Sequence, residues 1–160
     1  MKNLKQKFEK FDYNWRLSLE GGLNTRNKRI SAIRHSFWMD HEFLRKLYHN
    51  DYKIADGVYR ANQPSPKRIE MWSKRGLKSI LNFRGETNQG AYFLELEACN
   101  KYDIELINYP LFATKLPSKE AILGLETIFK NIRKPFLMHC KSGADRAGLG
   151  SALYYLYIMH

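Results

Sequence analysis

Cysteine is scarce in this chain: Cys99 and Cys140 are the two that occur among 160 residues. Two cysteines do not make a disulfide framework, which excludes a small secreted domain held together by disulfides. Long apolar runs are also missing, because the longest, 152–159, is far shorter than the roughly 20 residues that span a bilayer. The first residues include lysines but no apolar segment typical of a signal peptide. These absences predict a soluble, cytoplasmic protein.

Negative charge is the second scarcity, since 16 Asp and Glu stand against 27 Lys and Arg, a formal net charge of +11. Such an excess favours anionic partners: phosphorylated substrates, an acidic membrane surface or nucleic acid. The length fits one domain with a real core, and a 44% share of hydrophobic residues excludes a disordered chain.

The most informative stretch runs from Pro135 to the helix-like segment that begins at Arg146. Residues 136–140 form a short apolar run typical of a buried strand, and five residues with a glycine at position 143 separate Cys140 from Arg146. A strand that ends in a tight loop at a helix N-terminus makes an anion site, because backbone N–H groups and the helix dipole converge there. A cysteine in that field is expected to be largely thiolate, and a guanidinium can hold two phosphate oxygens. These parts suit attack of a thiolate on a bound phosphoryl group.

Residues 139–146, His-Cys-Lys-Ser-Gly-Ala-Asp-Arg, resemble the His-Cys-x5-Arg signature of the protein tyrosine and dual-specificity phosphatase superfamily. A rhodanese-like loop also carries a cysteine at a strand end, but it does not require the arginine at this spacing. The phrases at 57–64 and 82–86 are similar to bacterial dual-specificity-like phosphatases, so the resemblance covers roughly residues 52–160.

The predicted fold is α/β, with a central, mostly parallel sheet flanked by helices, because strands alternate with helices after residue 58. We expect a basic helical N-terminal extension at 1–50 and a phosphatase-like catalytic domain at 51–160. The predicted elements are a helix at 30–49, a hairpin around Asp56-Gly57, strands at 77–83, 104–111 and 136–140, and helices at 66–74, 92–102, 119–132 and from 146 onward.

The resemblance implies that Cys140 attacks phosphorus and that Arg146 stabilises the phosphoryl oxygens. It also implies that the phosphate is bound by the whole loop: Lys141, Ser142, Gly143, Ala144, Asp145 and Arg146. His139 is expected to tune the thiolate. Arg84 is a second-tier candidate, which either reaches the phosphate, clamps the loop or forms a surface ion pair with Glu86. No metal, other cofactor or nucleic acid is implied.

Two positions depart from the family pattern. Ala147 stands where the wider superfamily has a Ser or Thr that helps the thiolate leave, so Ser142 substitutes for it or the second step is slower. The general acid, an Asp some thirty residues before the cysteine, is missing from 108–118. Asp145 is the alternative proton donor, because myotubularin-like and Sac-like phosphatases also carry an Asp directly before this arginine. The other interpretation is that the Asp145 carboxylate only stabilises the loop or pairs with a nearby basic group.

Three functions therefore stay open. The first is a protein tyrosine or dual-specificity phosphatase acting on phosphorylated proteins or small phosphomonoesters. The second is a phosphoinositide or inositol phosphate phosphatase, and the third is a catalytically weak phosphate-binding module.

The last segment, 147–159, is apolar on nearly every side of a helix, which predicts that something covers it. We expect the helix at 30–49 to cover part of it. The alternatives are a partner chain or further residues of a longer product, which would make the catalytic domain incomplete at its C-terminal end.

Overall fold

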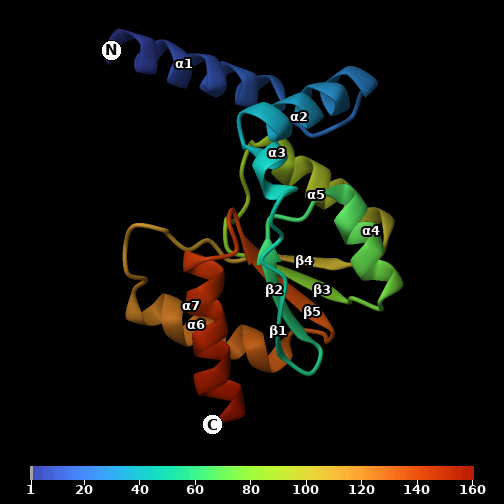
Figure 1. Cartoon of the computed structure of the whole chain (residues 1–160), viewed down its shortest axis with the longest axis vertical. Coiled ribbons are helices and arrows are strands. Elements are labelled where there is room, and N and C mark those ends of the chain that lie inside the picture. Colours follow the sequence, from blue (N-terminus) through green and yellow to red (C-terminus); the bar gives the residue numbers. More distant parts are fainter. Residues whose placement is uncertain (1) are drawn as a thin grey trace.

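The computed structural model of the chain describes residues 2–160, apart from the side chain of Lys2 (Figure 1). Its centre is a five-stranded sheet in the order β1-β2-β5-β3-β4. The strands are β1 (Tyr52–Ala55), β2 (Val58–Asn62), β3 (Ser79–Asn82), β4 (Glu105–Asn108) and β5 (Phe136–Cys140). The edge strand β1 pairs antiparallel with β2, and the other neighbours pair in parallel. The α/β prediction with a mostly parallel sheet is therefore confirmed.

Two layers of helices enclose the sheet. Helices α4 (Pro66–Lys74) and α5 (Gly90–Lys101) cover one face, and α6 (Lys119–Asn131) and α7 (Asp145–Tyr154) cover the other. The central strand β5 alternates between the layers, as the two-residue period of a strand requires. Its Phe136, Met138 and Cys140 join the core under α6 and α7, while Leu137 joins the core under α4 and α5. This alternation places Cys140, the last residue of β5, on the face that α6 and α7 cover.

The N-terminal helices are α1 (Lys2–Ser18), α2 (Arg26–Trp38) and α3 (Glu42–Arg45). The prediction of one helix over 30–49 is wrong, because the chain turns at His41, whose φ of 59° is left-handed. Helix α2 packs closely on α5: a Cβ at Gly90 would lie 2.3 Å from the carbonyl oxygen of Ala32. The glycine therefore fixes where the N-terminal helices sit.

The prediction that the 30–49 helix covers the C-terminal helix is also wrong. Helices α1 to α3 lie at the opposite end of the molecule from the C-terminus (Figure 1). Helix α7 continues into a π-helical turn, Tyr155–Met159, and α6 packs against both. Leu156 in this turn stays 60% exposed. The helices among residues 2–160 include none that is both long and apolar enough to cross a membrane.

Candidate active site

The loop from Cys140 to Arg146 joins the carboxyl end of β5 to the first turn of α7. The Cys140 side chain is 1% exposed, and the backbone N–H of Gly143 donates to its sulfur at 3.3 Å. Gly143 has a φ of +76°, and a Cβ there would lie 2.7 Å from the backbone of Ala61 and Asn62. A side chain at 143 would push the loop away from the end of β2, so this glycine sets the geometry around the sulfur.

Arg146 lies at the other end of the same loop. Its Nη1 approaches the carbonyl oxygens of Phe83 and Leu111 at 3.4 Å, which is long for a hydrogen bond. Its Nε is buried and has no hydrogen-bond partner among the residues that the structure describes. An unpaired buried N–H is costly, so this guanidinium is suited to an anionic ligand.

The other predicted loop residues surround these two. Asn50 Nδ2 donates to the carbonyl oxygen of Ser142 at 2.6 Å, which ties the loop to the segment before β1. The Ser142 hydroxyl accepts from the N–H of Ala144 at 3.4 Å. Asp145 is exposed and, within 2–160, has no salt bridge. It lines a hollow of about 390 Å³ together with Arg146 and the loop at 112–117, a loop without any carboxylate.

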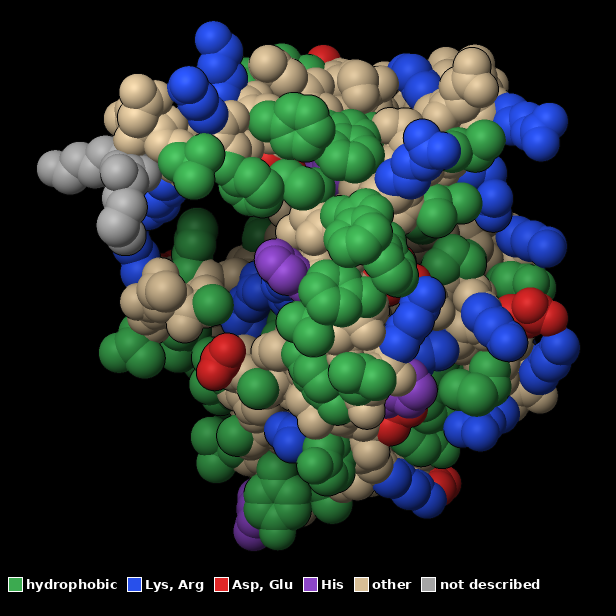
Figure 2. Space-filling model, turned by 45° about the horizontal axis from the view of Figure 1, so that its top comes forward, with side chains coloured by type: hydrophobic (Ala, Val, Ile, Leu, Met, Phe, Trp, Pro, Cys, Tyr) green, Lys and Arg blue, Asp and Glu red, His purple; other side chains and the backbone are tan. Residues whose placement is uncertain are grey.

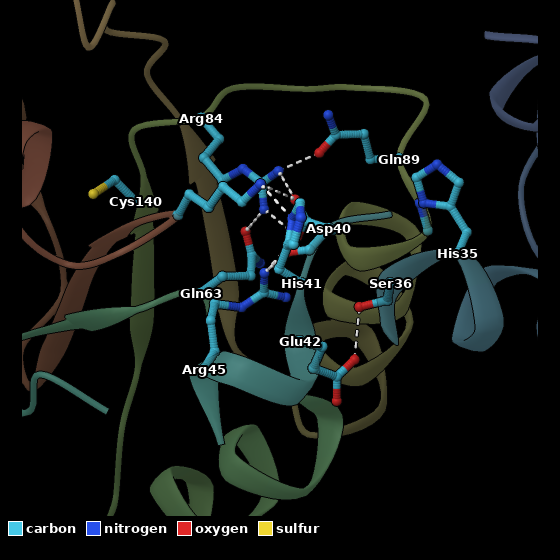
Figure 3. A network of polar contacts seen from close by, with 12 residues as sticks. His35, Ser36, Asp40, His41, Glu42, Arg45, Gln63, Arg84, Gln89 and Cys140 are labelled. Carbon is cyan, nitrogen blue, oxygen red and sulfur yellow. Dashed lines mark hydrogen bonds and ion pairs between the residues drawn. The ribbon is translucent and has the colours of Figure 1, made fainter. Parts of the chain in front are cut away.

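Arg84 is the centre of a buried ion network (Figure 3). Its two terminal nitrogens donate to the Asp40 carboxylate at 2.8 and 2.7 Å. Arg45 pairs with the same carboxylate at 2.9 Å, and Lys141 of the loop lies 3.5 Å from it. Of the roles predicted for Arg84, the surface ion pair with Glu86 is therefore wrong: its partner is Asp40, which is 3% exposed.

The charges around Asp40 determine its protonation state. Burial alone would raise the pKa of this carboxyl, but the hydrogen bonds and positive charge of Arg84, with Arg45 and Lys141, lower the pKa below its usual value. Asp40 is therefore a carboxylate at neutral pH. It holds Lys141, a predicted phosphate-binding residue, from the side of the N-terminal helices.

The network continues to the residue before the nucleophile candidate. Gln63 accepts from Arg84 at 2.8 Å and donates to Glu95 at 2.7 Å. The other Glu95 oxygen lies 2.7 Å from Nε2 of His139, and both side chains are fully buried. His139 is thus fixed by α5 rather than by the loop.

Sequence reasoning missed Asp40, Gln63 and Glu95, because their partners are far away in the chain. A signal existed for Glu95, a carboxylate between Leu94 and Leu96, and for Gln63, which lies within the phosphatase-like phrase at 57–64.

A polar hollow of about 410 Å³ separates the loop from the N-terminal helices. Arg84, Lys141 and Arg146 line one side, and Asp12 and His35 line the other. His35 Nε2 lies 3.1 Å from Asp12, while its Nδ1 accepts the backbone N–H of Gly90 at 3.3 Å. Burial lowers the pKa of His35, although Asp12 opposes the shift. The part of the chain that is described contains no group of three or more His, Cys, Asp or Glu side chains arranged to hold a metal ion.

Comparisons with known proteins agree with this geometry. The family described as a DSP-PTPase phosphatase fused to NAD+ kinase matches residues 45–158. The dual specificity protein phosphatase TpbA of Pseudomonas aeruginosa strain UCBPP-PA14 is 22% identical over 110 residues, which are 68% of this chain and 47% of TpbA. The chain thus spans about half the length of the curated relatives that it matches.

Solved structures of phosphatases share the fold. The core catalytic domain of the PP-IP phosphatase SIW14 from S. cerevisiae, in complex with citrate, is 25% identical. The alignment has a TM-score of 0.54 and covers 64% of this chain and 62% of that one. A structure of P. aeruginosa TpbA in complex with pTyr is 18% identical, with a TM-score of 0.52, covering 69% and 64%.

Proposed function

The chain belongs to the DSP-PTPase family of cysteine-dependent phosphatases, and from this membership we propose that it hydrolyses phosphomonoesters through a cysteinyl-phosphate intermediate. The observation that carries the proposal is the loop itself. It directs the Gly143 N–H at the Cys140 sulfur and leaves the Arg146 Nε buried without a partner among the described residues.

The reaction has two steps. The Cys140 thiolate attacks phosphorus, so that an S–P bond forms, the ester P–O bond breaks, and the leaving oxygen takes a proton. Water then attacks phosphorus, the S–P bond breaks, and the thiolate returns as inorganic phosphate leaves. Arg146 and the loop N–H groups bind the equatorial oxygens in both steps.

We assign the proton donor for the first step to Asp145. It is exposed at the start of α7, beside Arg146, and faces the hollow whose loop offers no other carboxylate. Ala147 supplies no hydroxyl to assist the departing thiolate, which favours a slow second step. Lys141, Ser142 and Ala144 complete the phosphate site, and His139 positions the strand end that carries the nucleophile.

The test is turnover of an aryl phosphate by Cys140→Ser and Arg146→Lys. We expect both variants to lose most activity, since serine is a far weaker nucleophile and a lysine cannot hold two oxygens at once. Cys99→Ala is the matched control, because Cys99 is fully buried in the core and burial raises the pKa of its thiol. Near-normal turnover by Cys140→Ser would contradict the covalent mechanism.

Phosphorylated proteins, above all phosphotyrosine, are the substrates that we propose first, and the pTyr complex of TpbA supports this class. Inositol phosphates are the second candidate, favoured by the SIW14 likeness and by the net charge of +11. A panel of phosphopeptides and inositol phosphates separates the two by kcat/KM. Binding of every panel member without turnover would instead indicate a phosphate-binding module.

We also propose that the N-terminal helices touch an acidic membrane surface. Residues 1–50 contain eleven Lys and Arg against five Asp and Glu. Figure 2 shows hydrophobic side chains gathered on the face that these helices form, with lysines and arginines around them. We call the set Phe37, Trp38, Phe43, Leu44 and Leu47 the aromatic patch; Leu47 is 82% exposed. Exposed aromatic and aliphatic side chains beside basic residues bind anionic lipid through such a combination.

Sedimentation with phosphatidylserine vesicles tests this contact. We expect Trp38→Ala/Leu47→Ala to lose binding, while Leu116→Ala, another highly exposed leucine outside the patch, keeps it. Equal binding by all three proteins would contradict the membrane proposal. The division of the chain at residue 50 and a cytoplasmic location, which suits a thiolate nucleophile, stay predictions.

A further inference from the structure

A groove of about 780 Å³ lies between α3 and α4, and neither Cys140 nor Arg146 lines it. Six cationic side chains do: Arg45, Lys46, Lys67, Arg68, Lys74 and Arg75. Glu42 and Glu70 are the carboxylates that face them. The groove is therefore a positive site of its own, apart from the phosphate loop.

The two carboxylates are already engaged. Glu42 lies 3.6 Å from Lys46 and Glu70 lies 2.7 Å from Lys74, and the members of each pair are four residues apart in the chain. Glu42 is half-buried, but both lysines are exposed, and ion pairs with exposed lysines are weak enough for the lysine to turn to another anion. Lys67 and Arg75 have no salt bridge among the residues described, so the groove keeps an excess of positive charge.

Two arginines of the groove, the buried Arg45 and the half-buried Arg68, have unused donors. Arg45 pairs with Asp40 and Arg68 with Asp51, both outside the groove lining. The Nε atom of each is buried and has no hydrogen-bond partner within 2–160. The Arg45 side chain is 5% exposed, so water satisfies its Nε poorly. Both arginines line the groove, and a guanidinium can hold two oxygens of one phosphate at once, so the pair favours an anionic ligand.

We propose that this groove binds a small organic polyphosphate of about nucleotide size. The volume lies within the roughly 300–1,000 Å³ typical of small-molecule sites. The cations match several phosphate groups, while Met71 and the methylene stems of the lysines and arginines offer an apolar wall to the organic part. Arg45 and Gln63 belong both to the groove and to the buried network, so the groove adjoins the network that reaches Lys141 of the phosphate loop.

Calorimetric titration with inorganic tripolyphosphate tests the proposal on the full chain. Wild type should show two binding events, one at the phosphate loop and one in the groove. Arg146→Met should remove the first and keep the second. Lys67→Glu should weaken the second by about tenfold, because it reverses one charge that contacts the ligand. Lys67 is exposed in the first turn of α4, where a glutamate favours the helix, so this variant is expected to fold.

Lys78→Glu is the control, since this exposed lysine gives the same change of net charge outside the groove. It should bind tripolyphosphate as wild type does. If Lys67→Glu and Lys78→Glu weaken tripolyphosphate binding equally, the effect comes from net charge alone and the groove is not a binding site. A single binding event that Arg146→Met abolishes would also overturn it, while leaving the proposed phosphatase function untouched.

Discussion

Asp40→Asn is the substitution that most sharply tests how the N-terminal helices are joined to the phosphate loop. The change keeps the shape of the side chain and removes its charge. Two buried cations, Arg84 and Arg45, then lose their common counter-charge. Breaking a buried ion pair by removing one partner costs about 3–5 kcal/mol. We expect a loss in this range rather than twice as much, because Gln63 and Gln89 still accept hydrogen bonds from Arg84.

Urea unfolding followed by circular dichroism measures this loss. For a chain of this size it corresponds to a fall in Tm of roughly 6–20 °C, at about 2–4 °C per kcal/mol. Asp56→Asn is the control: Asp56 is fully exposed and pairs with Lys53 at 3.0 Å, an arrangement that contributes little.

The pH dependence supplies a second check. Since the folded-state pKa of Asp40 is lowered, the stability that its charge contributes is complete above the unfolded pKa of about 4 and disappears as pH falls below it. The difference between wild type and Asp40→Asn should therefore stay constant from pH 7 to about pH 5 and shrink in stronger acid. A loss below about 1 kcal/mol at neutral pH would instead mean that water solvates the network and that Asp40 does not hold Arg84 and Arg45 as a buried counter-charge.

Three further predictions concern other parts of the molecule. His35→Gln should make the free energy of unfolding less dependent on pH between about 7 and 5.5. Because the pKa of His35 is lowered in the folded protein, its stabilising effect is present above about pH 6.5 and is lost as pH falls. Urea unfolding at a series of pH values measures this. Gly90→Ala should cost about 1–3 kcal/mol in urea unfolding, since the added methyl meets the Ala32 carbonyl; an unchanged midpoint would contradict the close packing of α2 on α5. Asp145→Asn should lower turnover of alkyl phosphates more than that of aryl phosphates, whose leaving groups need less protonation, and equal losses would remove Asp145 as the acid.

The sequence was sufficient for the parts of the fold that local patterns encode. Strand β5 was predicted with its observed bounds, because Pro135 and the loop glycine mark its two ends. The helix predicted at 119–132 is α6, Lys119–Asn131, which Ser118 caps by accepting the N–H of Ala121 at 3.2 Å. The helix predicted at 92–102 starts two residues late: α5 begins at Gly90, and glycine has a low helix propensity.

The errors share one physical cause, which is that distant contacts override a local pattern. The apolar stripe at 30–49 continues without Gly or Pro, so nothing local predicts the turn at His41. The turn brings Asp40 to Arg84, its partner 44 residues away. The same distinction applies to the site residues. Cys140 and Arg146 could be predicted because they belong to one contiguous motif, whereas Glu95 and Gln63 reach the site only through tertiary packing.

The central claim, a covalent phosphoryl-cysteine, is tested most directly by mass spectrometry of enzyme quenched in acid during turnover of an aryl phosphate. We expect the added mass of one phosphoryl group on the peptide that contains Cys140, none on the peptide that contains Cys99, and none on either peptide of Cys140→Ser. Ala147 has no hydroxyl that could assist departure of the Cys140 thiolate, so the phosphorylated enzyme should accumulate. Turnover by the wild type with no phosphorylated Cys140 peptide, at quench times well inside one catalytic cycle, would contradict it.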